Sequence, residues 1–136
     1  MIVVDTSAWI EHLRATASPA HLTLRSLLRE QADIAVTEIV IMELLAGARS
    51  DEHAVQLRST LLGFPVLPLR GLADYEAAAQ LYRCCRLAGR MVRKMTDCLI
   101  AVSAISAGAT LLHRDADFDT LATHTPLQIH PLLETS

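Results

Sequence analysis

Short apolar runs alternate along this chain with longer stretches in which apolar and polar positions mix. The run Ile2–Val4 leads directly into Asp5, and similar runs stand at 34–36 and 110–113. The stretches between them place apolar residues three or four positions apart, which is the spacing of a helix with one buried face. Strands that alternate with helices are typical of βαβ units. The pattern therefore predicts an α/β fold with a mainly parallel central sheet.

Hydroxyl side chains that can cap a helix precede several of the mixed stretches. Thr6 or Ser7 can cap a first helix, Ser18 a second, Thr37 a third that runs to about residue 48, and Thr96 a helix over 97–107. Apolar spacing predicts the buried faces. We expect the first helix to bury Trp9, Ile10 and Leu13, and a helix over 72–88 to bury Leu72, Tyr75, Ala79 and Tyr82.

Composition adds a size limit and a surface property. The 136 residues, taken as one domain over 1–136, are enough for a buried core without disulfides. Hydrophobic residues make up 51% of the chain and aromatic residues only 4%, so we expect an aliphatic core and an apolar surplus at the surface. That surplus predicts a homodimer or a bound protein partner.

Apolar runs, cysteines and charge narrow the class of protein. The longest apolar run, Ile39–Met42, is too short to cross a bilayer, and no basic segment with a cleavage site precedes the first strand. Cys84, Cys85 and Cys98 show no metal-binding spacing, and their odd number fits a reducing compartment. We therefore expect a cytoplasmic protein. The net charge of −3 argues against nonspecific coating of nucleic acid but does not exclude a local basic groove.

Acidic residues occupy the places where an α/β sheet binds ligands. Asp5 follows the first strand, and Asp115 and Asp117 follow the strand over 110–113, so a parallel sheet brings them to one edge. Glu43 stands among apolar residues and needs an arginine or a metal as partner, and Asp97 opens a helix. Each acid also has a simpler explanation as a cap, a turn residue or a dipole-complementing charge. Their combination favours a cluster.

Several carboxylates in one small cleft remain ionised only if a cation neutralises them. Oxygen ligands without histidine or thiolate select hard ions, so Mg²⁺ is the predicted metal, with Mn²⁺ as a substitute. None of the six histidines has metal-binding spacing, which disfavours zinc. Such a site suits the activation of water and the stabilisation of phosphoryl charge.

Four motifs together resemble a known family across essentially the whole chain. They are the strand into Asp5-Thr6-Ser7, the helix around Glu43, the segment TDCLIA with Asp97, and HRDADF with Asp115 and Asp117. The ordered set resembles the PIN domain, and specifically the VapC-type toxins of bacterial toxin–antitoxin pairs. The resemblance implies a three-layer α/β/α fold, a homodimer, and an antitoxin whose C-terminal segment blocks the cleft.

The resemblance also implies roles for individual residues. Asp5, Glu43, Asp97 and Asp115 would form the metal-binding and catalytic quartet of a ribonuclease. Asp117 would be a further or substitute ligand, and Thr6 or Ser7 would hold a carboxylate or a water behind the ligands. His113 departs from the family, which often has threonine there, but this position flanks the acids and supplies none of them.

A basic stretch precedes Asp97. It contains five of the twelve Lys and Arg residues with no acid between them: Arg83, Arg86, Arg90, Arg93 and Lys94. We predict that Arg86, Arg90, Arg93 and Lys94, with Arg114, contact the RNA backbone. The alternative is a solvated helix face that complements the helix dipole.

The function predicted from these observations is that of a Mg²⁺-dependent endoribonuclease toxin. It would cleave tRNA or rRNA with activated water, leave 5′-phosphate and 3′-hydroxyl ends, and inhibit translation until an antitoxin neutralises it. One alternative is a non-catalytic PIN-like module that binds RNA or an antitoxin. A haloacid-dehalogenase-like phosphatase is disfavoured, because that chemistry needs a second aspartate where this chain has Ser7.

Overall fold

The computed structural model describes residues 1–134, and a five-stranded sheet lies at its centre. All paired strands run parallel, in the order β3-β2-β1-β4-β5. The strands are β1 (Ile2–Val4), β2 (Ile34–Thr37), β3 (Val66–Leu67), β4 (Thr110–Leu112) and β5 (Gln128–Ile129). The predicted parallel sheet is therefore confirmed, and the proline-flanked β3 lies at its edge, where unpaired backbone groups are tolerated.

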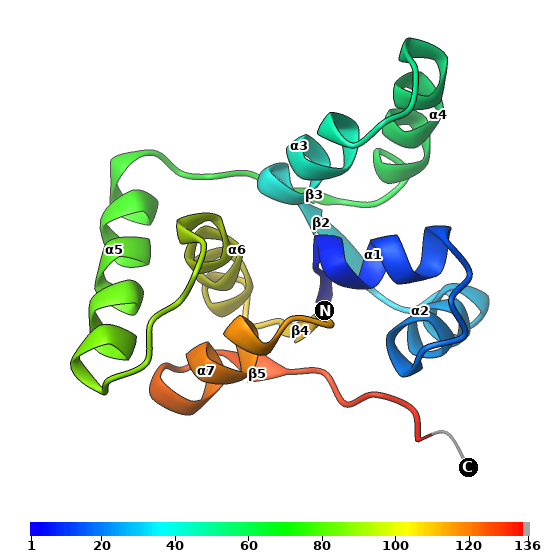
Figure 1. The fold of residues 1–136 in the computed structure, drawn as a ribbon. Coiled ribbons are helices and arrows are strands. Elements are labelled where there is room, and N and C mark those ends of the chain that lie inside the picture. The colour runs from blue at the N-terminus through cyan, green and yellow to red at the C-terminus, as the bar shows by residue number, and fades with distance from the viewer. Residues whose placement is uncertain (135–136) are drawn as a thin grey trace.

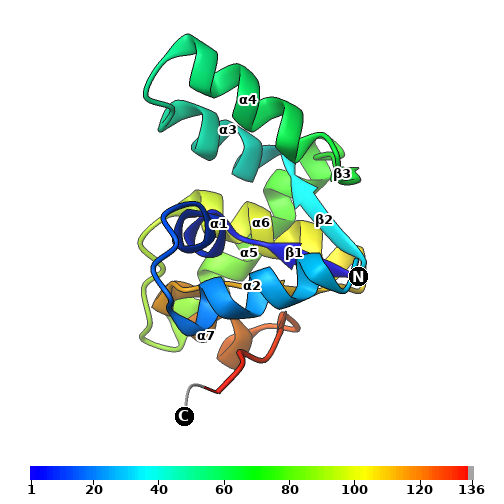
Figure 2. The ribbon, with the colours of Figure 1, turned by 90° about the vertical axis from the view of Figure 1, so that its right-hand side faces the viewer.

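Helices cover both faces of this sheet. They are α1 (Thr6–Leu13), α2 (Pro19–Arg29), α3 (Glu38–Ala46), α4 (Asp51–Leu61), α5 (Leu72–Leu87), α6 (Met95–Ser106) and α7 (Ala116–His124). Figure 1 shows α5 and α6 on one side of the strands and α1 and α2 on the other, which is the predicted three-layer α/β/α arrangement. Figure 2 shows α3 and α4 as a neighbouring pair that extends beyond the rest of the molecule.

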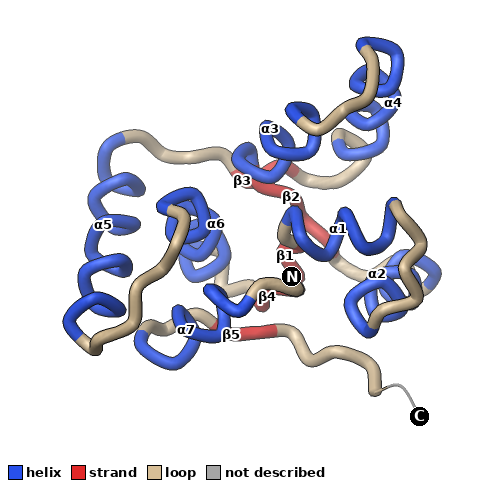
Figure 3. Tube along the Cα trace, viewed as in Figure 1, coloured by secondary structure: helices blue, strands red, loops and turns tan. Residues whose placement is uncertain are grey.

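The register of the central strands brings two acidic segments together. Val4 at the end of β1 pairs with Leu112 at the end of β4, and the Asp5 N–H donates to the Leu112 carbonyl (2.9 Å). Both strands are apolar because helices cover both faces, as in other parallel sheets. Because β1 and β4 are parallel and end in register, α1 and the loop that follows β4, both drawn in Figure 3, start at the same edge of the sheet. Asp5 and the segment after β4 therefore share that edge.

Two predicted buried faces are wrong in part. In α1, Trp9 is buried but Leu13 is exposed, because the last turn of the helix extends past the core. In α5 the predicted residues Leu72, Tyr75 and Ala79 are exposed, and Tyr82 is only half-buried. The buried residues of α5 are instead Asp74, Ala78 and Cys85.

The contacts of Asp74 explain why α5 buries a different face from the predicted one. Its carboxylate accepts a hydrogen bond from the Arg70 backbone N–H (2.8 Å) and pairs with the Arg70 guanidinium (2.9 Å). These bonds hold the pKa of Asp74 below its usual value, chiefly through the Arg70 side chain. A carboxylate that is satisfied in this way can turn toward the core, and the apolar stripe then faces outward.

Several element boundaries also differ from the prediction. Helix α6 begins at Met95, before Thr96, and its N-cap residue Lys94 makes no side-chain capping bond. The N-cap of α1 is Asp5, one residue before Thr6. Helix α3 ends at Ala46, just before Gly47, rather than near residue 48. Among the described residues, no helix is long and apolar enough to cross a membrane.

Candidate metal centre

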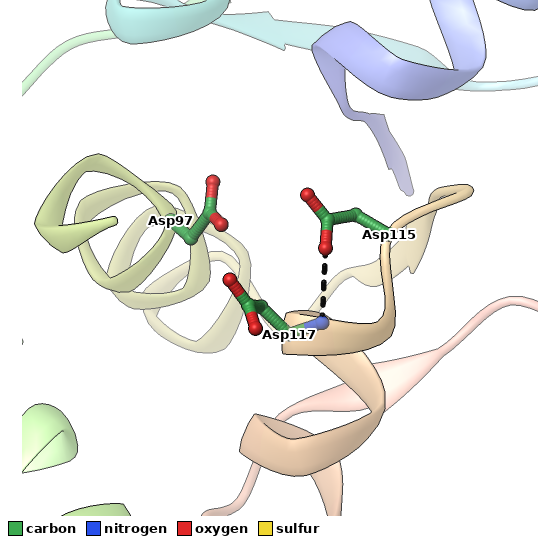
Figure 4. Close-up of side chains that lie close together, drawn as sticks. All are labelled: Asp97, Asp115 and Asp117. Atoms are coloured by element: carbon green, nitrogen blue, oxygen red, sulfur yellow. Dashed lines mark hydrogen bonds between the residues drawn. The ribbon is translucent and has the colours of Figure 1, made fainter. Parts of the chain in front are cut away.

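Three aspartates from two helices converge beside the carboxyl ends of β1 and β4. Asp97, Asp115 and Asp117 each offer a carboxylate oxygen, and these three atoms lie within 4.8 Å of one another. Figure 4 shows the carboxylates directed toward a common space. Asp97 is 2% exposed and Asp117 is also buried, while Asp115 is half-buried. The structure thus brings together three of the residues predicted from the sequence.

The start of α7 fixes the positions of Asp115 and Asp117. Asp115 is the N-cap residue, and its Oδ1 accepts a hydrogen bond from the Asp117 N–H (3.0 Å). The Asp115 N–H donates in turn to Nδ1 of His113 (3.0 Å), and Nε2 of this buried ring faces Asp119 Oδ1 (3.3 Å). A threonine hydroxyl can accept the same N–H in a turn of this kind. His113 therefore supports the loop that carries Asp115.

Asp5 caps α1 and is tied to the β4 loop through Ser7. Its Oδ2 accepts hydrogen bonds from the Ser7 N–H (2.9 Å) and the Ser7 hydroxyl (2.6 Å). The Arg114 N–H donates to the same Ser7 hydroxyl (2.8 Å). The capping role that the sequence also allowed for Asp5 is therefore correct. Asp5 is buried as well, and burial raises its pKa, with a smaller contribution from the charge of Asp115.

Asp97 has a strongly perturbed carboxyl group. Burial, and then the negative charge of Asp5, raise its pKa to about 7, with smaller contributions from Asp115 and Asp117 and an opposing one from Lys94. Its Oδ2 is buried and has no hydrogen-bond partner among the described residues. An unpaired buried carboxylate oxygen is unfavourable unless a cation or a proton meets it. Asp97 and its neighbours therefore fit a hard divalent cation, which oxygen ligands prefer.

Glu43 lies apart from this cluster. Its Oε1 accepts a hydrogen bond from the Thr6 hydroxyl (2.8 Å), and its side chain lines a groove between α1, α3 and α4 with Arg14 and Arg49. The charges that shift the pKa of Asp97 include Asp5 but not Glu43. Among the described residues no arginine forms an ion pair with Glu43, and its hydrogen-bond partner is the Thr6 hydroxyl. Thr6 connects Glu43 to the residue that follows Asp5.

The predicted basic residues differ in their surroundings. Arg93 lies against the acidic cluster, with its NH2 group 3.0 Å from Asp115 Oδ1 and its Nε 3.3 Å from Asp117 Oδ2. Arg114 pairs with Glu11 (2.6 Å). The remaining predicted residues are exposed: Arg86, Arg90 and Lys94. The pairing of Arg93 was not predictable from the sequence, because this residue precedes α6 in a loop without periodic pattern.

Comparison with known proteins identifies the family of this chain. The sequence model of the PIN domain family matches residues 2–123. The ribonuclease VapC11 of Mycobacterium tuberculosis is 48% identical over 129 residues, which are 94% of this chain and 96% of the relative.

Solved structures agree on the fold. VapBC2 from Rickettsia felis, bound to a DNA fragment from its promoter, superposes with a TM-score of 0.72 over 96% of this chain and 98% of its own, at 19% identity. VapBC-5 from M. tuberculosis, a member of the VapBC family of toxin–antitoxin systems, gives a TM-score of 0.62 at 25% identity and covers 93% of this chain and 94% of its own.

Proposed function

This chain belongs to the PIN domain family, and from that membership we propose that it is the RNA-cleaving toxin of a toxin–antitoxin pair, with a divalent metal ion at its active site. The observation that carries the proposal is the cluster of Asp97, Asp115 and Asp117, in which a buried oxygen of Asp97 lacks a partner among the described residues. The similarity to a ribonuclease over 94% of the chain supports the reaction.

We assign Mg²⁺ as the ion, with Mn²⁺ as a substitute, because all the candidate ligands are carboxylates. Asp97, Asp115 and Asp117 would hold it, with Asp5 beside them. Asp5 contributes to the raised pKa of Asp97, which supports its place in the same site. Glu43 belongs to the proposed catalytic set through the family motif, and its bond to Thr6 is the contact that supports it. Ser7 would orient Asp5, and Thr6 would orient Glu43, through the hydrogen bonds described above.

The chemistry of the bound ion is the activation of water and the stabilisation of charge on a phosphodiester. The chain's own residues then need to hold the ion and to position the RNA strand. No protein nucleophile is required, and hydrolysis in line leaves 5′-phosphate and 3′-hydroxyl ends. Arg86, Arg90, Lys94 and Arg114 are proposed as backbone contacts for the RNA, because phosphate neutralisation is the main source of affinity for nucleic acids.

The proposal also covers the location, oligomeric state, substrate and partner of the protein. The protein is a cytoplasmic homodimer whose substrate is tRNA or rRNA and whose partner is an antitoxin that blocks the cleft. We also treat residues 1–136 as a single domain. Buried side chains from Val3 to Leu127 form one hydrophobic cluster, which supports that view.

The proposal is tested with the purified protein, total tRNA and rRNA, and either Mg²⁺ or EDTA. We expect cleavage only with the metal, and a loss of about a hundredfold or more in Asp97→Asn, since metal-held water carries the reaction. Asp51→Asn is the matched control, because Asp51 is an exposed acid in the first turn of α4. Cleavage in EDTA, or full activity in Asp97→Asn, would contradict the mechanism. A folded protein that binds RNA without cleaving it would instead be a binding module.

A further inference from the structure

Arg93 forms three hydrogen bonds with the acidic cluster. Its backbone N–H (3.1 Å) and its Nε (3.3 Å) both donate to Asp117 Oδ2, and its NH2 donates to Asp115 Oδ1 (3.0 Å). The residue comes from the segment that connects α5 to α6, and its side chain is 70% exposed. A flexible cationic side chain therefore reaches the carboxylates from the solvent side.

The bonds of Arg93 use one oxygen of each carboxylate. Asp115 Oδ1 also accepts the Asp117 N–H, while the hydrogen bonds of the described residues leave Asp115 Oδ2 and Asp117 Oδ1 without a donor. Asp97 Oδ2 is likewise unpartnered and buried. Arg93 thus compensates Asp115 and Asp117 but leaves Asp97 Oδ2 without a partner among the described residues.

We propose that Arg93 is the internal counterion of the metal site, which stabilises the metal-free protein and gives way when a divalent cation binds. The inference rests on the proposed function only in assigning such a cation to the three aspartates. A guanidinium 3.0 Å from an oxygen of one ligand repels an incoming cation and shares the charge that attracts it. Its pairing is therefore stronger without metal than with it.

Thermodynamic linkage predicts how this difference changes the metal affinity and the melting temperature. Suppose that a group stabilises the metal-free state more than the metal-bound state. It then weakens metal binding by the difference between these two stabilisation free energies. Removal of the Arg93 charge should therefore lower the melting temperature in EDTA but strengthen metal binding. A residue with a purely structural role would lower the melting temperature equally in both states and would leave the affinity unchanged.

The experiment uses Arg93→Gln and a titration of Mn²⁺ into the protein by calorimetry at pH 8, with melting curves in EDTA and in excess Mn²⁺. Because an exposed ion pair is weak, we expect Mn²⁺ affinity to rise about fivefold and Tm in EDTA to fall by about 3 °C. The Tm difference should shrink in excess Mn²⁺. The backbone bond from residue 93 to Asp117 persists in the variant and favours a folded protein.

Two further variants separate charge from geometry. Arg90→Gln removes the same charge from the same connecting segment, where Arg90 forms no ion pair with the described residues, and should change neither quantity. Arg93→Lys keeps the charge and should resemble the wild type in Mn²⁺ affinity. Unchanged or weaker Mn²⁺ binding in Arg93→Gln would overturn the proposal. These measurements contain no RNA, so a protein without ribonuclease activity can still pass or fail them.

Discussion

At the scale of single residues, the candidate site is defined by how each acid is compensated. Asp5 is held by Ser7, Asp115 and Asp117 by Arg93, and Glu43 by Thr6, whereas one oxygen of Asp97 has no partner among the described residues. Asp97 is therefore the acid whose protonation is most sensitive to the presence of a cation.

Asp97 predicts a dependence of metal binding and stability on pH. Its pKa is about 7 in the folded protein, against an ordinary value of 3.8, so protons compete with the metal below pH 7. Mn²⁺ affinity should fall by up to about tenfold between pH 7 and pH 6. In EDTA the folded state holds this proton more tightly than the unfolded state, so the contribution of Asp97 to stability is present at low pH and is lost as pH rises from about 4 to 7.

Urea unfolding in EDTA at pH 5 and pH 8 checks the stability part of this prediction. Asp97→Asn should be more stable than the wild type at pH 8, where the wild type carries a buried charge, and should lose most of that advantage at pH 5. An equal difference at both pH values would show that Asp97 does not titrate in this range.

Two replacements of His113 that are equal in shape, threonine and valine, should differ in their effect on Mn²⁺ affinity. Threonine can still accept the Asp115 N–H, whereas valine cannot, although both remove the ring that contacts Phe118. We expect His113→Val to bind Mn²⁺ about fivefold more weakly than His113→Thr, because a hydrogen bond contributes about 1 kcal/mol. Calorimetric titration measures this difference. Equal affinities would mean that the bond to His113 does not position Asp115.

At the scale of elements, α5 shows how one polar residue decides which face of a helix is buried. The pairing of Asp74 with Arg70 turns Asp74 inward, and Leu72, Tyr75 and Ala79 then form an exposed apolar stripe. Such a stripe is unfavourable in water unless another surface covers it. The predicted homodimer offers such a cover.

Self-association through this stripe is testable by sedimentation. Tyr75→Glu places a charge at the centre of the stripe. It should raise the Kd of the dimer about tenfold, because a buried unpaired charge is costly. Gln80→Glu adds the same charge to α5 outside the stripe and should leave the dimer unchanged. A Tyr75→Glu protein that remains fully dimeric would exclude this face as the interface.

At the scale of the whole molecule, the central sheet was the most predictable feature. The runs at 2–4, 34–36 and 110–112 are apolar because both faces of the sheet are covered, and their order with the intervening helices leads to parallel pairing. The same reasoning predicted that Asp115 and Asp117 share an edge with Asp5, whereas the approach of Asp97 was predicted from the combined pattern of acids and the family resemblance.

Features that depend on long-range contacts were not predictable from the pattern. The apolar spacing in α5 fits more than one buried face, and the choice depends on a bond from Arg70 outside the helix. The separation of Glu43 from the cluster depends on how α3 packs beside α1, and the pairing of Arg93 depends on the path of an irregular segment. Charge and spacing alone do not determine these contacts.

Asp97, Asp115 and Asp117 are proposed to form a divalent-metal site, and a calorimetric Mn²⁺ titration of the RNA-free protein at pH 8 shows whether they do. We expect saturable binding by the wild type and by Asp51→Asn, and a loss of affinity of about a hundredfold in Asp97→Asn, since removal of a group that only orients a metal ligand already costs about 10- to 100-fold. Binding of equal affinity in all three proteins would show that Asp97 does not hold the metal.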